Sequence, residues 1–269
     1  MLPTIYITDC YDENTKARQA TRIQNLIPDV TSVNFIGVRS SLEAAGNLVD
    51  TLDALEGRPG LIFINVAPRG TGRWPNGTPF GYLHYNNAHI FTTIEGTGLS
   101  LLKKLAPEPL PPVRLFDVPK VVTKLEVDAE TQQHIIHSQF RSFDFLPRLA
   151  AKVLTGETLE STPWSDIPPC PPAIWWKDNF GNLKTTLLPE DVDFAPDKTI
   201  TLTWNNRTKH SFVCYNRLKD MPHNQTGIYI GSSGLPGKRL LEIATQKGDD
   251  LIGDYDSSLP LQVGDSITI

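Results

Sequence analysis

The feature that most constrains the fold is a nearly continuous apolar segment, Gly60-Leu-Ile-Phe-Ile-Asn-Val66. A strand that is apolar on both faces is typical of the interior of a parallel sheet with helices on each side. Before it, β-rich runs predict strands at residues 4–8 and 30–38. Helical spacing predicts helices at residues 15–26 and 42–55. This strand and helix alternation predicts an α/β domain at the N-terminus with a mainly parallel sheet.

The pattern changes after a predicted helix at residues 145–154. Residues 157–172 are rich in Pro, Ser and Thr and show no periodicity, which is typical of a linker. Beyond them the helical period disappears, and short alternating segments predict strands. We therefore predict an α/β domain at residues 1–156, a linker at 157–172 and a smaller all-β, barrel-like domain at 173–269. The short segments are residues 174–177, 199–204, 211–215 and 228–230.

Composition narrows the class of protein. The chain has 269 residues and a net charge of −5, and its 25 Lys and Arg residues are scattered, so we expect no nucleic-acid partner. Cys10, Cys170 and Cys214 lie far apart, which favours reduced thiols over disulfides or a zinc site. The N-terminus shows neither a signal pattern nor a membrane span, and we expect a cytoplasmic protein. The histidines show no metal spacing, so we expect no metal site.

Several short motifs carry the polar residues that suit a nucleoside ligand. Asp9 ends a predicted strand, at the sheet edge where α/β proteins bind ligands. A Gly- and Pro-rich loop follows the strand at 60–66, and loops in that place tend to carry function. The remaining motifs lie in the predicted second domain. They are Asp178-Asn-Phe-Gly-Asn182, Gly231-Ser-Ser-Gly234, Leu241-Glu-Ile-Ala244 and Val263-Gly-Asp265.

Together with Ile7-Thr8-Asp9 and the loop Asn65-Val-Ala-Pro-Arg-Gly-Thr-Gly-Arg73, these motifs resemble the S-adenosylmethionine (SAM) hydroxide adenosyltransferase and SAM-dependent fluorinase/chlorinase family, over nearly the whole chain. The resemblance implies nucleophilic substitution at the ribose C5′ of SAM by hydroxide, halide or another small anion, which releases L-methionine. It implies SAM as substrate, no further cofactor, no metal, and homotrimers with sites between the domains of neighbouring subunits.

The resemblance also implies roles for individual side chains. Asp9 would accept the ribose hydroxyls, and its alternative role is a helix N-cap or turn. Asp178 would pair with the substrate ammonium, although its motif is equally typical of a β-turn. Ser232 and Ser233 would donate to the methionine carboxylate, although such a loop is common. The implied substrate-binding set is Asp9, Asn87, Phe140, Asp178, Phe180, Asn182, Ser232, Ser233, Glu242 and Ala244.

The implied catalytic set is Arg73, Gly70 and Ser142. Phe140 and Ser142 resemble the family's halide-pocket segment, with a core aromatic as the alternative for Phe140. The family's water-activating aspartate and histidine positions hold Ala67 and Arg141. Without a carboxylate and an imidazole, water activation by a general base is not expected.

Three functional hypotheses follow. The first is an enzyme that substitutes at C5′ of SAM or catalyses the reverse reaction. The second is a catalytically inactive protein that binds SAM or adenosine, which the residues at positions 67 and 141 favour. The third is a trimeric scaffold whose ligand pocket is vestigial.

Overall fold

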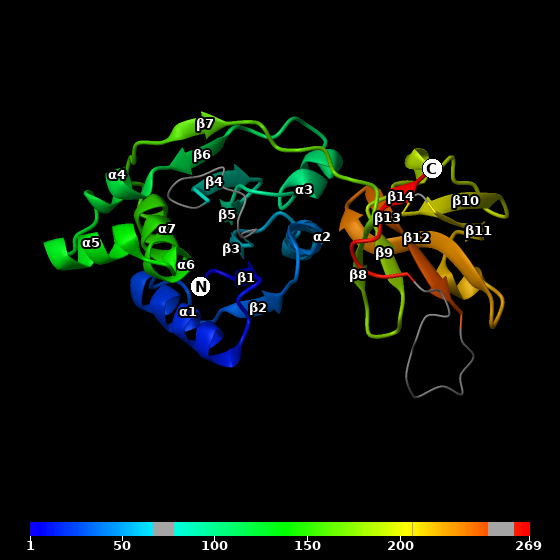
Figure 1. The fold of residues 1–269 in the computed structure, drawn as a ribbon, viewed down its shortest axis with the longest axis horizontal. Helices are drawn as coiled ribbons and strands as arrows, with labels where there is room; N and C mark the ends of the chain where they lie inside the picture. The colour runs from blue at the N-terminus through cyan, green and yellow to red at the C-terminus, as the bar shows by residue number, and fades with distance from the viewer. Residues whose placement is uncertain (67–77, 206, 247–260) are drawn as a thin grey trace. The chain divides into compact units, whose positions relative to one another are not determined.

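The computed structural model describes residues 1–66, 78–205, 207–246 and 261–269 (Figure 1). It divides into two compact units, Met1–Pro168 and Pro169–Ile269. The division falls inside the segment predicted as a linker. Unit 1 combines helices with a sheet, and unit 2 is built from strands around a sheet of its own.

The sheet of unit 1 has seven strands in the order β2-β1-β3-β5-β4-β6-β7. Strands β2, β1, β3 and β5 pair in parallel, and the pairs β5–β4, β4–β6 and β6–β7 are antiparallel. The predicted parallel sheet is therefore present in one half, and the other half is antiparallel. The strands are β1 Thr4–Thr8, β2 Asn34–Gly37, β3 Gly60–Asn65, β4 Phe80–Tyr85, β5 Ala88–Thr93, β6 Val113–Phe116 and β7 Thr162–Trp164.

Helices cover this sheet on both sides. In Figure 1, α1, α6 and α7 lie on one side of β1 and β3, and α2 and α3 lie on the other. Side chains cap several helix N-termini, as in α2, where Ser40 accepts from the N–H of Glu43. The helices are α1 Glu13–Leu26, α2 Ser41–Leu55, α3 Ser100–Leu105, α4 Val118–Val122, α5 Ala129–His137, α6 Arg141–Asp144 and α7 Leu146–Leu154.

A row of aromatic rings crosses five strands on the face that α1 and α7 cover. The rings sit at paired positions of β2, β1, β3, β5 and β4. Successive ring centroids are 5.5, 5.3, 5.7 and 4.9 Å apart. These distances are those of favourable aromatic pairs. The rings, in strand order, are Phe35, Tyr6, Phe63, Phe91 and Tyr82.

Two departures from the predicted strands have local causes. The strand expected at 30–38 is only Asn34–Gly37, because the N–H of Val30 donates to the carbonyl of Ile27 in a turn after α1. The alternating segment at 83–94 contains parts of two strands, β4 and β5. The turn between them includes Asn86 at φ 46°, a left-handed conformation that Asn tolerates well.

The sheet of unit 2 also has seven strands, in the order β14-β10-β11-β12-β13-β9-β8. Among these described strands, only β11 and β12 pair in parallel. The strands are β8 Ile174–Lys177, β9 Leu183–Thr185, β10 Thr199–Trp204, β11 Thr208–Tyr215, β12 Thr226–Leu235, β13 Lys238–Thr245 and β14 Ile267–Thr268, with short 3-10 helices at Pro189–Asp191 and Leu218–Asp220.

The two ends of this sheet meet. Ala173, next to β8, forms an isolated bridge with Ser266, next to β14. The carbonyl of Ile174 accepts from the N–H of Gly264 at 2.9 Å, and the N–H of Ile174 donates to the carbonyl of Asp265 at 3.1 Å. The sheet is thus a nearly closed barrel, in agreement with the predicted barrel-like domain. Its interior is apolar and includes Leu183, Leu202, Phe212, Ile228, Leu241 and Ile243.

No helix in the described ranges is long and apolar enough to span a bilayer.

The aromatic row predicts a large stability effect at its centre. Phe63 is fully buried between two stacked rings, so Phe63→Ala should destabilise unit 1 by about 3–5 kcal/mol. Urea unfolding followed by intrinsic fluorescence measures this. Phe180→Ala serves as control, because that ring is 56% exposed and its loss should change stability by less than about 0.5 kcal/mol. Equal effects of the two changes would contradict the packing role of Phe63.

Candidate functional site

Asp9 lies at the topological switch point of the unit 1 sheet, where two successive crossover connections run in opposite directions along the sheet. It follows β1 directly, and β1 pairs with β2 on one side and with β3 on the other. In open α/β sheets, ligands bind beyond the carboxyl ends of the strands at such a switch point. The Asp9 side chain is exposed, and its backbone N–H donates to the carbonyl of Asn65 at the end of β3, at 3.2 Å.

The turn that carries Asp9 is held by a buried hydroxyl. Thr8 Oγ1 accepts from the backbone N–H of Cys10 at 3.0 Å and from Asn65 Nδ2 at 3.4 Å. The N-cap of α1 is Asp12, whose carboxylate accepts from the N–H of Thr15 at 3.0 Å. The helix-cap role that was the alternative for Asp9 is therefore filled by Asp12.

A groove of about 880 Å³ opens beside Asp9. Its lining brings Asp9 together with Phe140, although the two residues lie far apart in the sequence. Arg18 also lines it, with its guanidinium carbon 5.3 Å from the centre of the Phe140 ring, which is a cation–π contact. The groove is lined by Asp9, Cys10, Tyr11, Asp12, Glu13, Thr15, Lys16, Arg18 and Phe140.

Ser142 is not among the residues that line this groove. Its side chain is buried, and its Oγ accepts from Gln19 Nε2 at 3.4 Å, while its carbonyl accepts from the hydroxyl of Tyr6 at 3.3 Å. Burial raises the pKa of that tyrosine above its usual range, so the hydroxyl stays a neutral donor. Phe140 stacks on Phe143, with ring centroids 5.5 Å apart. The structure thus gives the Ser142 hydroxyl an internal partner.

Other predicted residues of unit 1 lie elsewhere. Asn87 sits in the turn before β5, at the sheet edge opposite Asp9, and its side-chain amide donates to the carbonyl of Gly57 at 2.7 Å. The structure does not bring it to the groove. Arg141 begins α6, where burial lowers the pKa of its guanidinium below the usual value. Ala67, Arg69, Gly70 and Arg73 lie outside the described residues.

In unit 2, Asp178 organises the turn between β8 and β9. Its Oδ1 accepts from the backbone N–H groups of Phe180 and Asn182, each at 2.9 Å, and its Oδ2 accepts from Asn182 Nδ2 at 3.0 Å. Gly181 completes the turn at φ 82°. This geometry confirms the turn interpretation, and it presents the ring of Phe180 at 56% exposure.

A buried polar row crosses three strands beside this turn. Lys184 of β9 pairs in register with Glu242 of β13, and Glu242 pairs with Tyr229 of β12. The Tyr229 hydroxyl donates to Glu242 Oε2 at 2.8 Å, and Lys184 Nζ lies 3.6 Å from Glu242 Oε1. Burial, together with the Glu242 charge, raises the pKa of Tyr229 above its usual range. We call Lys184, Glu242 and Tyr229 the polar row.

Ser232 and Ser233 adjoin the polar row. The backbone N–H of Ser232 donates to Glu242 Oε1 at 3.2 Å, and Lys184 Nζ donates to Ser233 Oγ at 2.5 Å. The expectation of a Gly-Ser-Ser-Gly loop is wrong, because these residues lie within β12 at an irregularity of its pairing with β13. A glycine suits position 231, because a Cβ there would collide with the Glu242 carboxylate.

Glu242 and Ala244, which the resemblance includes in the substrate-binding set, flank Ile243 in β13 of the same sheet. Ile243 is paired on both sides, with Ile228 of β12 and Leu183 of β9, so its hydrogen bonds run into the sheet. Ala244 is buried and packs with Tyr229 and Met221 in a small apolar cluster. Within unit 2 the structure therefore brings together Ser232, Ser233 and Glu242, and it adds Lys184 and Tyr229, which sequence reasoning missed.

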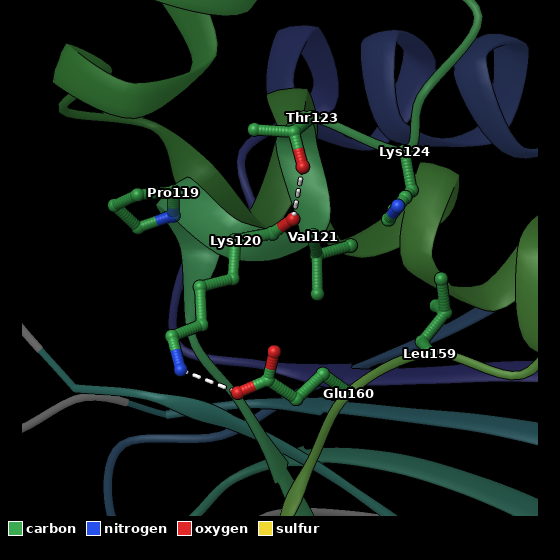
Figure 2. A pocket seen from close by; sticks show the side chains of 7 residues that line it. All are labelled: Pro119, Lys120, Val121, Thr123, Lys124, Leu159 and Glu160. Atoms are coloured by element: carbon green, nitrogen blue, oxygen red, sulfur yellow. Dashed lines mark hydrogen bonds and ion pairs between the residues drawn. The ribbon is translucent and has the colours of Figure 1, made fainter.

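A second cleft of unit 1, of about 350 Å³, lies between α4 and the segment that precedes β7 (Figure 2). Figure 2 shows the ammonium of Lys120 paired with the carboxylate of Glu160 across it. None of its lining residues belongs to the predicted site, so the groove at Asp9 is the better candidate. Within the described ranges, no three His, Cys, Asp or Glu side chains gather as metal ligands would.

The similarity of this chain to known proteins is a similarity of fold. No family model matches the chain, and no curated protein sequence matches it. The chain is similar to the crystal structure of an uncharacterized conserved protein from Thermotoga maritima, with a TM-score of 0.66 and 16% identity over 98% of both chains. It is also similar to a conserved hypothetical protein from Thermus thermophilus, with a TM-score of 0.58 and 16% identity over 99% of both chains. The whole two-unit chain therefore shares its fold with these structures.

The cap assignment predicts a pH-dependent stability difference. Hydrogen bonds from Thr15 lower the pKa of Asp12 below its usual 3.8, so the charged carboxylate stabilises α1 above about pH 4. Asp12→Ala should lower the Tm at pH 7, and the gap to wild type should close as the pH falls below that value. Asp9→Ala, measured in parallel by circular dichroism, should leave the Tm near that of wild type. A larger loss for Asp9→Ala would make Asp9 the structural residue.

The polar row predicts a specific cost for one hydroxyl. Tyr229→Phe leaves Glu242 Oε2 without its tyrosine donor, which should destabilise the protein by about 1–3 kcal/mol. Tyr215→Phe is the matched control, because that hydroxyl donates to Gln225 at an exposed site, and its loss should cost less than about 0.5 kcal/mol. Urea unfolding measures both changes. Equal costs would mean that the hydroxyl of Tyr229 adds nothing to the row.

Proposed function

We propose that this chain binds S-adenosylmethionine and catalyses nucleophilic substitution at its ribose C5′, releasing L-methionine. The observation that carries the proposal is the place of Asp9. It is an exposed carboxylate at the carboxyl end of β1, at the switch point of the sheet and beside a groove. A carboxylate there suits the vicinal hydroxyls of a ribose, each of which can donate a hydrogen bond to it.

The amino-acid and adenine parts of SAM are assigned to unit 2. The Asp178 carboxylate accepts three internal hydrogen bonds, and a carboxylate has about four lone-pair sites, so one remains for an ammonium group. Phe180 offers an exposed ring that can pack on the nucleoside. Ser232 and Ser233, next to the polar row, are assigned to the carboxylate of the methionine part.

The chemistry needs little from the protein beyond placement. The anion forms a bond to C5′ as the C5′–S bond breaks, and the bonding pair leaves on sulfur, which becomes the neutral thioether of methionine. Since the sulfonium is already a good leaving group, in-line positioning and exclusion of water supply most of the acceleration. Hydroxide, halide or another small anion serves as nucleophile, and SAM is the only other reactant.

We also propose that the protein is a cytoplasmic homotrimer, in which each site is completed by the domains of neighbouring subunits. Light scattering coupled to size-exclusion chromatography measures the mass of the assembly.

A second candidate function is binding of SAM or adenosine without turnover. Arg141 favours it, because this half-buried guanidinium occupies the position where the hydroxide-using proteins of the resembled family have an imidazole. Guanidinium stays protonated near neutral pH and cannot act as a general base. The two candidates differ in one measurable respect, which is the release of L-methionine.

The ribose assignment predicts a loss of affinity on a change of one functional group. Asp9→Asn removes the negative charge from the proposed acceptor, and the Kd for SAM and for adenosine in calorimetry should rise at least about tenfold. Asp29→Asn, at an exposed aspartate in the turn after α1, is the matched control and should bind as wild type does. Wild-type protein that binds neither compound would overturn the proposed function.

Turnover is tested on the same protein. Incubation with SAM and hydroxide, chloride, fluoride or larger anions should release L-methionine, measured by chromatography against a heat-inactivated sample. Binding of SAM with no methionine above that control for any anion would leave the second candidate as the function.

A further inference from the structure

Arg18 is a cation of the groove beside Asp9 that no motif of the sequence singled out. It lines the groove from α1 and is exposed. Its guanidinium carbon lies 5.3 Å from the centre of the Phe140 ring and 4.5 Å from the centre of the Phe143 ring. Both distances are those of cation–π contacts. The two rings therefore hold the guanidinium at the groove.

The neighbouring cations of α1 are paired with carboxylates, and Arg18 is not. The ammonium of Lys16 lies 2.8 Å from Glu13, and the guanidinium of Arg22 lies 3.9 Å from Asp144. Within the described ranges, no carboxylate pairs with Arg18, and no acceptor bonds to its side-chain N–H groups. A cation–π contact engages the charge of a guanidinium but leaves its N–H donors to other acceptors. These donors are therefore available to a ligand in the groove.

The other charges of the groove do not exclude an anion. Asp12 accepts from a backbone N–H in the first turn of α1, and Glu13 pairs with Lys16. Asp9 is the third carboxylate, and the proposed function assigns it to the neutral hydroxyls of the ribose. Three carboxylates and two cations give a formal charge of −1 (2 − 3), which the partial positive charge of the α1 N-terminus offsets in part. The excess of negative charge is thus small, and Arg18 can attract an anion locally.

The planar guanidinium suits an oxyanion better than a halide. Its N–H donors form a fork that binds two oxygens of a carboxylate or a phosphate at once. A halide or a hydroxide offers a single acceptor atom and does not match the fork. The hydroxyl of Ser142, in the segment that resembles a halide pocket, accepts from Gln19 and does not line the groove. The groove therefore favours an oxyanion.

We propose that Arg18 is a specificity-determining residue that binds the nucleophile, and that this nucleophile is a small oxyanion, either a carboxylate or a phosphate. This inference rests on the proposed function and deepens it, because it names the class of the second substrate. One oxygen of the anion forms the bond to C5′ as the C5′–S bond breaks, and the bonding pair leaves on the sulfur of methionine. The second product is then an ester at the 5′ oxygen of adenosine.

The first test measures anion binding apart from turnover. Calorimetry on wild-type protein saturated with adenosine should give a Kd for acetate or for inorganic phosphate at least about tenfold below that for chloride. Arg18→Met should raise the Kd of the preferred oxyanion at least about tenfold and leave the Kd of adenosine within about threefold. Circular dichroism of each variant checks that it folds.

Two further variants separate the fork from the charge. Arg18→Lys keeps the positive charge and loses the planar fork, so it should lose most of the preference for the oxyanion over chloride. Arg58→Met removes an exposed arginine that pairs with Glu56, and as the matched control it should bind all the anions as wild type does.

The second test identifies the oxyanion by its product. With SAM and acetate, the enzyme should release L-methionine and 5′-O-acetyladenosine, and with SAM and inorganic phosphate it should release L-methionine and adenosine 5′-phosphate. Chromatography distinguishes the two esters. For the anion that is used, Arg18→Met should raise the KM of the anion at least about tenfold and leave the KM of SAM within about threefold.

The outcomes distinguish this inference from the function on which it rests. If wild-type protein binds neither SAM nor adenosine, the proposed function fails and this inference fails with it. If it binds adenosine but neither oxyanion more tightly than chloride, or releases methionine only with halide or hydroxide, only this inference is overturned. An unchanged preference in Arg18→Met would also overturn it, as would equal weakening of adenosine and oxyanion, which would assign Arg18 a structural role.

Discussion

The parallel pairing of β1 with both β2 and β3 is the constraint on which unit 1 depends. Parallel neighbours cannot be joined by a tight turn, so the chain must cross over through α1 and then through α2. Right-handed crossovers in opposite directions place these helices on opposite faces, which obliges the central strands to be apolar on both. Because the two crossovers run in opposite directions, they leave the carboxyl end of β1 uncovered between β2 and β3. Asp9 lies at that end.

In unit 2, by contrast, β9 and β13 have one apolar face and one polar face. Leu183 and Ile243 face the apolar interior of the barrel, while Lys184 and Glu242, one residue along each strand, face away from it. A carboxylate and an ammonium are tolerated in a buried position only when hydrogen bonds complete their surroundings. The hydroxyl of Tyr229 and the backbone N–H of Ser232 donate such hydrogen bonds to Glu242. The pairing register of β9, β13 and β12 brings these groups together.

The sequence carried part of this information. The apolar runs in β1 and β3 predicted their strands closely, because a long apolar run without helical spacing has few alternatives. The alternating run around Asn86 did not show where the chain turns, and so the antiparallel half of the sheet went unforeseen. The place of Asp9 followed from strand order alone. Lys184 escaped notice because its neighbours Glu242 and Ser233 are distant in sequence, and only strand register brings them together.

The bridge between Ala173 and Ser266 has a consequence for how such a chain can arise. It brings the first and last strands of unit 2 side by side, so the barrel leaves almost no open edge that would template association with another sheet. Unit 2 thus has an apolar core of its own and a sheet whose two ends pair with each other. Domains with a core of their own and few open sheet edges are the kind that tolerates fusion to other domains.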